Sequence, residues 1–243
     1  MKIYDVAFLG MGASALATAK LKYKGTSISL IGIDKNYHSK RNNFFAFWLT
    51  DWMKDFDSLA QKKWFCWNFY LTNNHIKHET KDLPYCTIRY QDWKNYCLKG
   101  LENLSIKEFN VQSITNLKKY YEIKLENGEE IFAKKIYDSR TPKLENEKVK
   151  QHFFGYLIET KQMINSNSVT LMDFRVEQKM GLHFMYCLPI DENRMLVEST
   201  VFSSEIQEDA WYQKQILEYI ETKLNLSEYK IVDEEKGALP MYD

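Results

Sequence analysis

The stretch YDVAFLGMGASA, from Tyr4 to Ala15, decides the fold of the N-terminal part of this chain. Its first half, up to Leu9, is a short apolar run typical of a buried strand. After the two glycines an alanine-rich run predicts a helix that stops near Gly25, and TSISLIGIDKN (residues 26–36) predicts a second strand. A strand, a turn, a helix and a strand in this order predict a βαβ unit.

The turn of this unit has the form G-x-G-x-x-A, built from Gly10, Gly12 and Ala15. Gly10 allows the tight turn, Gly12 lets a pyrophosphate approach the backbone, and the small Ala15 lets helix and strand pack closely. Asp34 follows 22 residues after Gly12, where a carboxylate can accept hydrogen bonds from an adenosine ribose. We therefore predict a dinucleotide site for FAD or NAD; the alternative is a plain βαβ unit with a glycine turn.

The composition of the 243 residues argues against several other classes. Lys+Arg and Asp+Glu number 33 each, so no net charge recruits nucleic acid. No apolar run reaches the roughly 18 residues of a membrane span, and no signal peptide opens the chain, so we expect a cytoplasmic protein. The four cysteines form no C-x-x-C pair, and His75 and His78 lack matching ligands, so we expect reduced thiols and no metal.

The middle of the chain is rich in aromatic residues, above all between Phe44 and Tyr70. This segment is either an aromatic core cluster or the lining of a pocket. A strand that ends near Arg89 and a helix follow it. The run after that helix alternates with period two around Asn127-Gly128, which predicts a meander hairpin that returns to a final strand, KKIYDSR (residues 134–140).

The βαβ unit, the meander and a strand that ends in Asp138-Ser139-Arg140 together resemble the FAD domain of glutathione-reductase-like flavoproteins. Thr141 stands where that family usually has glycine. The resemblance implies a mixed α/β fold: a Rossmann-like FAD-binding domain with a βαβ start and a β-meander, plus a substrate domain built on an antiparallel sheet. We expect residues 1–45 and 80–142 in the first domain and 46–79 and 143–243 in the second.

The second half resembles lycopene cyclases of the β-cyclase type in several ordered motifs. They are Q-x-F-x-G (151–155), L-M-D (171–173), F-x-Y-x-L-P (184–189) and L-[VIL]-E-x-T (196–200), and Trp48 matches the tryptophan of the family's aromatic stretch. Family members continue past an E-x-G-x-[LI]-P-M segment into another glycine-rich stretch. Because this chain stops at Asp243, we expect a fragment or a shortened homologue.

The resemblance implies a non-redox reaction, in which the ψ end of lycopene is protonated, closes into a six-membered ring and loses a proton to give a β-ionone ring. It implies reduced FAD, NADPH as the electron donor, and lycopene or a related acyclic carotenoid as substrate. Because that substrate dissolves in membranes, we expect peripheral membrane contact through the segment from Phe44 to Tyr70. The expected cofactor-binding residues are Gly10, Gly12, Ala15, Asp34, Arg89 and Asp138.

Glu198, within the apolar run MLVEST (residues 195–200), is the expected catalytic acid. It matches the glutamate of the family motif, and apolar neighbours raise a carboxyl pKa because they disfavour the charged form. The alternative is a solvated carboxylate or an ion pair with Arg194. Asp173 is the second candidate, either hydrogen-bonded to Glu198 or held by Arg175 in a structural role.

Aromatic faces are expected to stabilise the carbocation, with Trp48, Phe184 and Tyr186 as candidates. Two other functions remain open from the sequence. One is a flavin-dependent redox enzyme of the same fold, such as a polyprenyl reductase or a hydroxylase. The other is a non-catalytic remnant that binds carotenoid.

Overall fold

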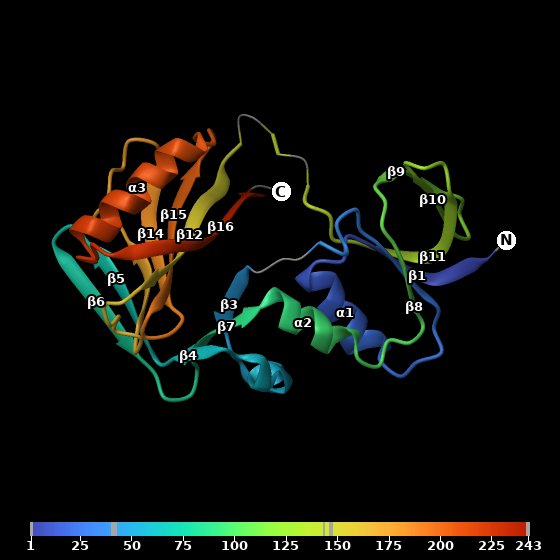
Figure 1. Cartoon of the computed structure of the whole chain (residues 1–243). Helices are drawn as coiled ribbons and strands as arrows, with labels where there is room; N and C mark the ends of the chain where they lie inside the picture. The colour runs from blue at the N-terminus through green and yellow to red at the C-terminus, as the bar shows by residue number, and fades with distance from the viewer. Residues whose placement is uncertain (1, 40–42, 143, 146–147, 242–243) are drawn as a thin grey trace. The chain divides into compact units, whose positions relative to one another are not determined.

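The computed structural model describes residues 2–39, 43–142, 144–145 and 148–241, and the chain divides into two compact units (Figure 1). The first unit comprises Met1–Asn42 and Arg89–Thr141, and the second comprises Asn43–Ile88 and Pro142–Asp243. The sequence placed the strand that ends at Arg89 in the first domain. In the structure this strand belongs to the second unit, and the break falls where it ends.

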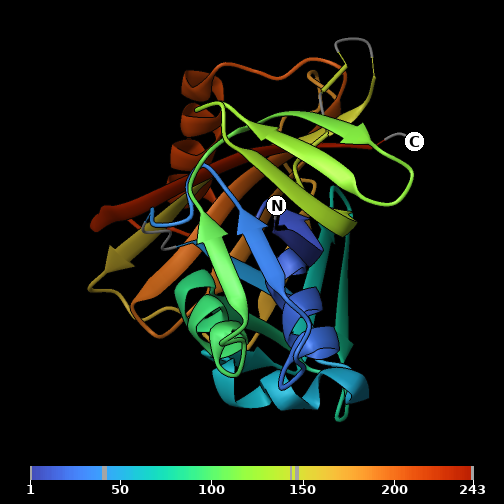
Figure 2. The ribbon, with the colours of Figure 1, turned by 90° about the vertical axis from the view of Figure 1, so that its right-hand side faces the viewer.

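Six strands form the mixed sheet of the first unit. They are β1 (Ile3–Leu9), β2 (Leu30–Ile33), β8 (Leu104–Lys107), β9 (Val111–Asn116), β10 (Tyr121–Leu125) and β11 (Glu130–Asp138). Their order is β8-β2-β1-β11-β10-β9, with β8, β2, β1 and β11 parallel and the last two strands antiparallel. Figure 2 shows β8 beside β2, which completes the predicted parallel core.

The second strand of the predicted hairpin and the predicted final strand are one element, β11. Its first half pairs antiparallel with β10 across the Asn127-Gly128 turn, where Gly128 has φ +86°. Its other edge runs parallel to β1, and Leu9 lies opposite Asp138. The strand therefore connects the meander to the βαβ unit and ends beside the glycine turn.

Two helices, α1 (Ala13–Tyr23) and α2 (Tyr90–Leu98), pack against each other in this unit. Phe8 of β1 stacks on Tyr137 and meets Tyr23 of α1 edge to face, which joins α1 to one face of the sheet. The second face buries apolar residues of the parallel strands and the meander: Ala7, Leu9, Ile31, Ile33, Ile123, Leu125, Ile131 and Ala133.

Seven strands form the larger sheet of the second unit. They are β5 (Cys66–Leu71), β6 (Asn74–Glu79), β12 (Lys150–Thr160), β13 (Val169–Asp173), β14 (Leu182–Pro189), β15 (Arg194–Ser203) and β16 (Tyr229–Pro240). Their order is β16-β12-β15-β14-β13-β5-β6, antiparallel except for the parallel pair of β13 and β5. The predicted mixed fold class, with an antiparallel second sheet, is confirmed.

Helix α3 (Asp209–Thr222) covers one face of this sheet, which we call the helix face (Figure 1). Its buried residues pack on alternate positions of the central strands, including Met185, Val197 and Val201. The intervening positions, such as Leu196, Glu198 and Thr200, lie on the opposite face, which we call the acid face. Alternation is a direct consequence of the two-residue period of a strand.

Part of the acid face is covered by the aromatic segment that the sequence left open between core and pocket. It forms β3 (Phe44–Trp48), a 3-10 helix η1 (Asp51–Leu59) and β4 (Lys62–Trp64), and with β7 (Tyr85–Arg89) it makes a three-stranded sheet, β3-β7-β4. Trp64, Trp67 and Tyr85 join Leu188 and Leu196 of the larger sheet in one buried cluster. Much of the segment is therefore core.

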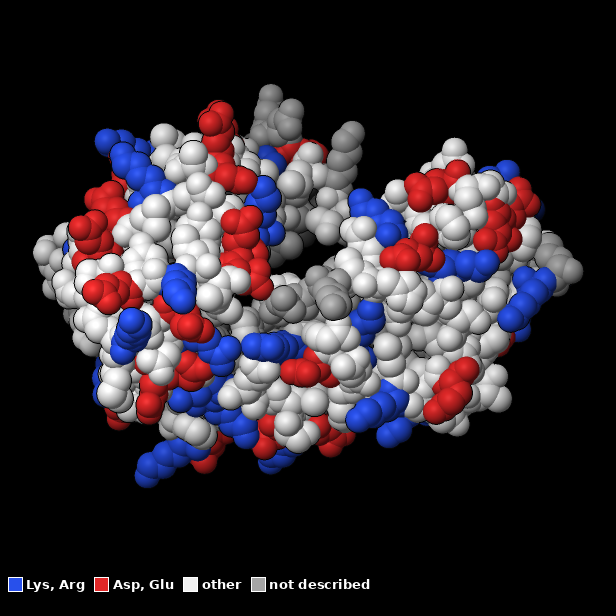
Figure 3. All heavy atoms as spheres, in the orientation of Figure 1, with Lys and Arg blue, Asp and Glu red and all other residues white. Residues whose placement is uncertain are grey.

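His75 and His78 lie on a strand, β6, and not on the helix that would bring residues spaced by three together. His75 stacks on Tyr70 and His78 stacks on Trp67. Within the described ranges, no three His, Cys, Asp or Glu side chains gather as metal ligands, and no helix is long and apolar enough to cross a membrane. Acidic and basic side chains are interspersed on the visible surface of each unit (Figure 3).

Candidate functional site

The glycine turn of the first unit has the geometry that a pyrophosphate site needs. Gly10 has φ +80°, and a Cβ there would lie 3.2 Å from the Ser139 Oγ. Gly12 is the N-cap residue of α1, and among the described atoms none lies within 4 Å of where its Cβ would be. A pyrophosphate can therefore approach the backbone at Gly12, where the first N–H groups of α1 have no intrahelical acceptor and can bind an anion.

Asp34 lies half-buried directly after β2, beside this turn. Its Oδ2 accepts a hydrogen bond of 2.8 Å from the Met11 N–H, and its Oδ1 accepts one of 2.8 Å from the Asn36 N–H. A carboxylate has about four acceptor sites, so both oxygens can still accept hydrogen bonds from ribose hydroxyls. The structure thus brings Asp34 together with Gly10 and Gly12 as the spacing predicted, and Ala15 is buried in the first turn of α1.

Asp138 ends β11 beside the glycine turn, and its contact with a cofactor stays a prediction. Its carboxylate is held by Arg140, whose Nε and Nη2 donate hydrogen bonds of 2.9 and 2.6 Å, and these bonds hold the carboxyl pKa below its ordinary value. The adjacent Ser139 donates its N–H to the Leu9 carbonyl at 2.8 Å and its hydroxyl to the Gly10 carbonyl at 2.9 Å. The D-S-R segment therefore supports the glycine turn.

Arg89 precedes α2 as its N-cap residue, with extended backbone. The next residue, Tyr90, donates its hydroxyl to the Met11 carbonyl at 2.9 Å, so the start of α2 is tied to the glycine turn. A contact between Arg89 and a cofactor stays a prediction. The turn as a whole fits a dinucleotide, because it offers an open helix end for the pyrophosphate and a carboxylate for the ribose.

Glu198 lies in the middle of β15 on the acid face of the second unit. It is opposite Gly155 of β12 on one side and opposite Tyr186 of β14 on the other. Gly155 is in turn opposite Glu235 of β16. Directly opposed residues of antiparallel strands share a face, so Glu235, Gly155, Glu198 and Tyr186 form one row across four strands.

The surroundings of Glu198 favour its protonated form. Burial raises its pKa to about 8, with help from the negative charge of Glu235 and against the hydrogen bond that the Thr200 hydroxyl donates to it. Among the ion pairs of the described residues, none includes Glu198. Arg194, the alternative partner, pairs with Asp191 at 2.6 Å instead. Glu198 is thus a half-buried acid without a cationic partner.

Of the three aromatic candidates, Tyr186 is directly opposite Glu198, and its hydroxyl lies 2.7 Å from the hydroxyl of Tyr85. Phe184 is two positions along the same strand, on the same face, with its ring centroid 6.2 Å from that of Phe202. Trp48 contacts Tyr85, and the centroids of their rings are 4.8 Å apart. The acid face therefore combines a carboxyl with aromatic rings.

Asp173 is on the other face, so of its two alternatives the hydrogen bond to Glu198 is wrong and the ion pair with Arg175 is present. It pairs with Met185, which precedes Tyr186, so its side chain is on the helix face. There its Oδ2 accepts a hydrogen bond of 2.7 Å from Tyr219, and Arg175 donates two, of 2.9 and 2.6 Å. Burial opposes ionisation, but these hydrogen bonds outweigh it and lower the carboxyl pKa.

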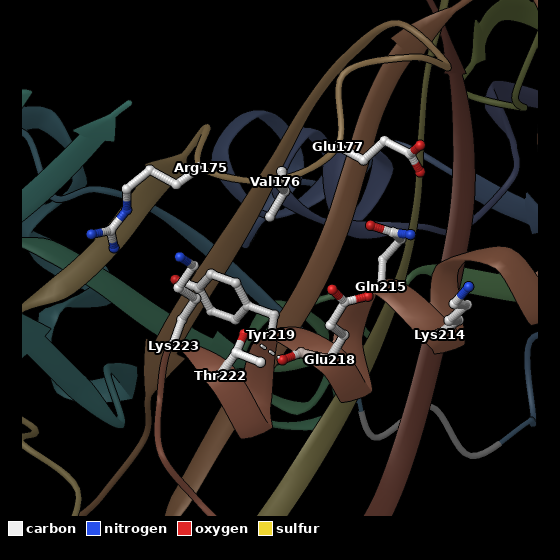
Figure 4. Close-up of a pocket in the computed structure, with 9 residues that line it drawn as sticks. All are labelled: Arg175, Val176, Glu177, Lys214, Gln215, Glu218, Tyr219, Thr222 and Lys223. Carbon is white, nitrogen blue, oxygen red and sulfur yellow. Dashed lines mark hydrogen bonds between the residues drawn. The ribbon is translucent and has the colours of Figure 1, made fainter. Parts of the chain in front are cut away.

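A polar pocket of about 460 Å³ opens beside Arg175 and Tyr219, between α3 and the loop after β13 (Figure 4). Its lining is Arg175, Val176, Glu177, Lys214, Gln215, Glu218, Tyr219, Thr222 and Lys223. Asp173 is fully buried behind it. The pocket belongs to the helix face, and its many charged side chains make it a poor match for a hydrocarbon.

Glu235 is the residue of this site that the sequence did not indicate. Burial raises its pKa to about 7, with a further contribution from the charge of Asp233. Its position inside the E-x-G-x-[LI]-P-M segment was the available signal. Its neighbour across the sheet is 80 positions away in the chain, so only the strand pairing shows that it shares a row with Glu198.

Comparison with known sequences gives one family. The model of the family described as lycopene cyclase protein matches residues 5–243. No curated protein matches the chain.

Comparison with solved structures gives several proteins of low sequence identity. A geranylgeranyl bacteriochlorophyll reductase-like protein from Thermoplasma acidophilum has a TM-score of 0.71 and 11% identity over 99% of this chain and 67% of its own. The p-nitrophenol 4-monooxygenase PnpA from Pseudomonas putida DLL-E4 has a TM-score of 0.72 and 12% identity, over 97% and 68%. The halogenase PltM, solved with phloroglucinol and FAD, has a TM-score of 0.66 and 11% identity; the chain covers 60% of its length. These similarities show the fold.

Proposed function

Because this chain belongs to the lycopene cyclase family, we propose that it is an isomerase that converts the ψ end of lycopene, or of a related acyclic carotenoid, into a β-ionone ring. The observation that carries the proposal is Glu198. Its pKa of about 8 keeps the carboxyl protonated near neutral pH, as an acid in an apolar site must be. A protonated carboxyl on an aromatic face is suited to protonating an alkene.

The chemistry needs one proton donated and one removed. The Glu198 carboxyl donates its proton to the terminal double bond of the ψ end, and the resulting carbocation is attacked by the next double bond, which closes the six-membered ring. Loss of a proton from the ring then gives the β-ionone double bond, so the product is an isomer of the substrate. The rings of Tyr186 and Phe184 lie on the same face as the acid and stabilise positive charge through their quadrupoles.

FAD is the proposed cofactor, held by the first unit. The N-terminus of α1 at Gly12 would bind the pyrophosphate, and Asp34 would accept hydrogen bonds from the ribose. Reduced FAD, with NADPH as the electron donor, would supply negative charge that stabilises the cation. The fold that the chain shares with the FAD-bound halogenase PltM supports this choice.

A flavin-dependent reductase or hydroxylase is the second candidate, because the chain also shares its fold with the reductase-like protein and the monooxygenase. Product analysis separates the two. A cyclase gives a product of unchanged mass and consumes no NADPH in proportion to product, whereas a redox enzyme consumes one equivalent per turnover. A remnant that only binds carotenoid would show neither.

The direct test is Glu198→Gln in the cofactor-loaded enzyme, assayed for cyclic product from lycopene in vesicles with reduced FAD. Because glutamine has the size of glutamate but cannot deliver a proton, we expect cyclisation to fall by about 10²–10⁴-fold. Glu234→Gln is the matched control, because Glu234 is exposed and opposes Tyr156 on the helix face. Near-normal cyclisation by Glu198→Gln would place the acid elsewhere.

Peripheral membrane contact is proposed through exposed apolar side chains of the aromatic segment. Trp52 of η1 is 72% exposed and Phe65 is 45% exposed. Tryptophan and phenylalanine are the side chains that interfacial segments use. Flotation with lycopene-loaded liposomes tests this contact, and complete recovery in the soluble fraction would contradict it.

A further inference from the structure

The row across the acid face contains two carboxyl groups with a glycine between them. Glu198 and Glu235 are each opposite Gly155, on the strands to either side of β12. Two strand spacings separate their backbones by about 10 Å, and two glutamate side chains can bridge that span when no side chain stands between them. Glycine at position 155 therefore leaves a gap that both carboxyls can enter.

Gly155 does not need to be glycine for backbone reasons, since its φ is not in the left-handed region. A Cβ there would meet the Glu198 Cβ and the Leu196 Cδ1 at 3.4 Å and the Glu198 Cγ at 3.5 Å, which are ordinary contacts. An alanine would thus fit, and its methyl group would occupy the position in the row between Glu198 and Glu235. Glycine in a strand interior weakens the strand, and it often marks a close approach.

The groups that face Glu198 come from four elements besides its own strand. Tyr186 of β14 and Tyr85 of β7 carry neutral hydroxyls whose pKa values burial raises. On the β16 side are Glu235 and, opposite Leu157, Asp233. From β12 come Gly155 and the apolar Phe153 and Leu157 of the same face. No cation among the described ion pairs balances the two glutamates, so their mutual repulsion is not relieved by a salt bridge.

We propose that Glu198 and Glu235 share one proton across Gly155, and that Glu235 is a positioning residue that keeps Glu198 in its acid form. This proposal rests on the proposed cyclase function, in which Glu198 is the proton donor. Two carboxyls in one row, with only a glycine between them and no cation paired with either among the described residues, cannot both ionise readily, so one of them retains a proton. After Glu198 gives its proton to the substrate, the proton released from the ring returns to the pair, and the proton count over one cycle is unchanged.

The raised pKa values of the two groups agree with this arrangement. That of Glu198 is about 8 and that of Glu235 about 7, and the charge of Glu235 contributes to the first. As pH rises, Glu235 therefore ionises before Glu198, and Glu198 keeps its proton beside the charged Glu235.

Infrared titration of the 243-residue chain with carboxyl-labelled glutamate tests the pair without any cofactor or substrate. The protonated carboxyl band that disappears in Glu198→Gln identifies Glu198. Removing the charge of Glu235 makes ionisation of Glu198 easier, so Glu235→Gln should lower the midpoint of this band by about one pH unit or more. Because a glutamine amide could itself donate to Glu198, Glu235→Ser must give the same direction of shift. Glu234→Gln is the control and should leave the midpoint in place.

Gly155→Ala tests the gap. In that background, Glu235→Gln should move the Glu198 midpoint by less than it does with glycine at 155, because the methyl group separates the carboxyls. Circular dichroism checks that each variant is folded. An unmoved midpoint in both folded Glu235 variants, or an equal shift with alanine at 155, would overturn the shared proton.

The pH profile of cyclisation distinguishes the shared proton from the cyclase function on which this proposal rests. In the loaded enzyme, cyclisation should decline at high pH as Glu198 ionises, and Glu235→Gln should move that decline to lower pH. If Glu198→Gln abolishes cyclisation but Glu235→Gln leaves the pH profile unchanged, only the shared proton is wrong. If Glu198→Gln cyclises lycopene normally, the proposed function of Glu198 fails, whatever the infrared titration shows.

Discussion

The two faces of the seven-stranded sheet each hold a carboxyl group, and the two groups have opposite protonation preferences. On the helix face, Asp173 is fully buried but accepts hydrogen bonds from Arg175 and Tyr219, and its pKa is lowered. On the acid face, burial raises the pKa of Glu198 to about 8. Burial disfavours the charged form of both carboxyls, so the two differ in whether hydrogen-bond donors outweigh it.

The partners decide it. A guanidinium group and a phenol donate three hydrogen bonds to the Asp173 side chain, so its charged form is stabilised in place. Glu198 has one hydroxyl donor, Thr200, and a second carboxyl, Glu235, in its row. A buried carboxyl with a cation is a structural group, whereas one with a like-charged neighbour is available for proton transfer.

Stability should show the largest difference between the two faces. Asp173→Asn removes the charge to which Arg175 and Tyr219 donate hydrogen bonds, so it should lower the free energy of unfolding by about 3 kcal/mol. This value is the lower end for a broken buried ion pair, because Arg175 remains partly hydrated. Glu198→Gln should leave it unchanged or slightly higher. Denaturant unfolding of both variants measures this. Equal losses would mean that Glu198 is structural as well.

The sequence was sufficient for features that depend on local order. The glycine turn, Asp34 at the end of a strand and the D-S-R strand end all occur within or next to single elements, and the structure has each of them in place. The apolar neighbours of Glu198 likewise indicated a raised pKa, because their effect acts within one strand.

The sequence was insufficient where long-range pairing sets the chemistry. The register of β13 against β14 shifts between Thr170 and Asp173, so alternation along the chain could not tell which face Asp173 occupies. Glu235 lies in a strand of mostly exposed residues, and its link to Glu198 runs through Gly155 of a third strand. His75 and His78 looked compatible with a helix because an isolated polar stretch carries no strong period.

Asp34 is a third kind of carboxylate, because it accepts its hydrogen bonds from backbone N–H groups. The two N–H groups that donate to it, those of Met11 and Asn36, leave acceptor sites for a ribose. Asp34→Ala should weaken FAD binding by about 1.5–3 kcal/mol, the range for a hydrogen bond to a charged group. Flavin fluorescence titration measures it, and Glu234→Gln, an exposed change on the other unit, serves as the control. Unchanged affinity would show that Asp34 only shapes the turn.

The pH dependence of stability is the finest test of the two faces. Glu198 has a folded pKa of about 8 against an ordinary value of 4.5, so between these values the unfolded chain loses its proton first, and stability falls as pH rises. Each such group contributes a slope of at most about 1.4 kcal/mol per pH unit. Asp173 has the opposite sign: its stabilisation is present above its ordinary value of 3.8 and is lost as pH falls through its lowered pKa.

Glu198→Gln should therefore flatten the decline in stability between about pH 5 and 8 and leave the acid limb unchanged. Asp173→Asn should do the reverse, with a flatter acid limb and an unchanged decline toward pH 8. Chemical denaturation repeated across this pH range measures both slopes. In Glu198→Gln the free energy of unfolding should still decline somewhat as pH rises, because the pKa of Glu235 is also raised, to about 7. If both variants changed the same part of the pH profile of stability, the two carboxyls would have the same protonation state. The hydrogen bonds from Arg175 and Tyr219 would then not explain the difference between a structural and a reactive acid.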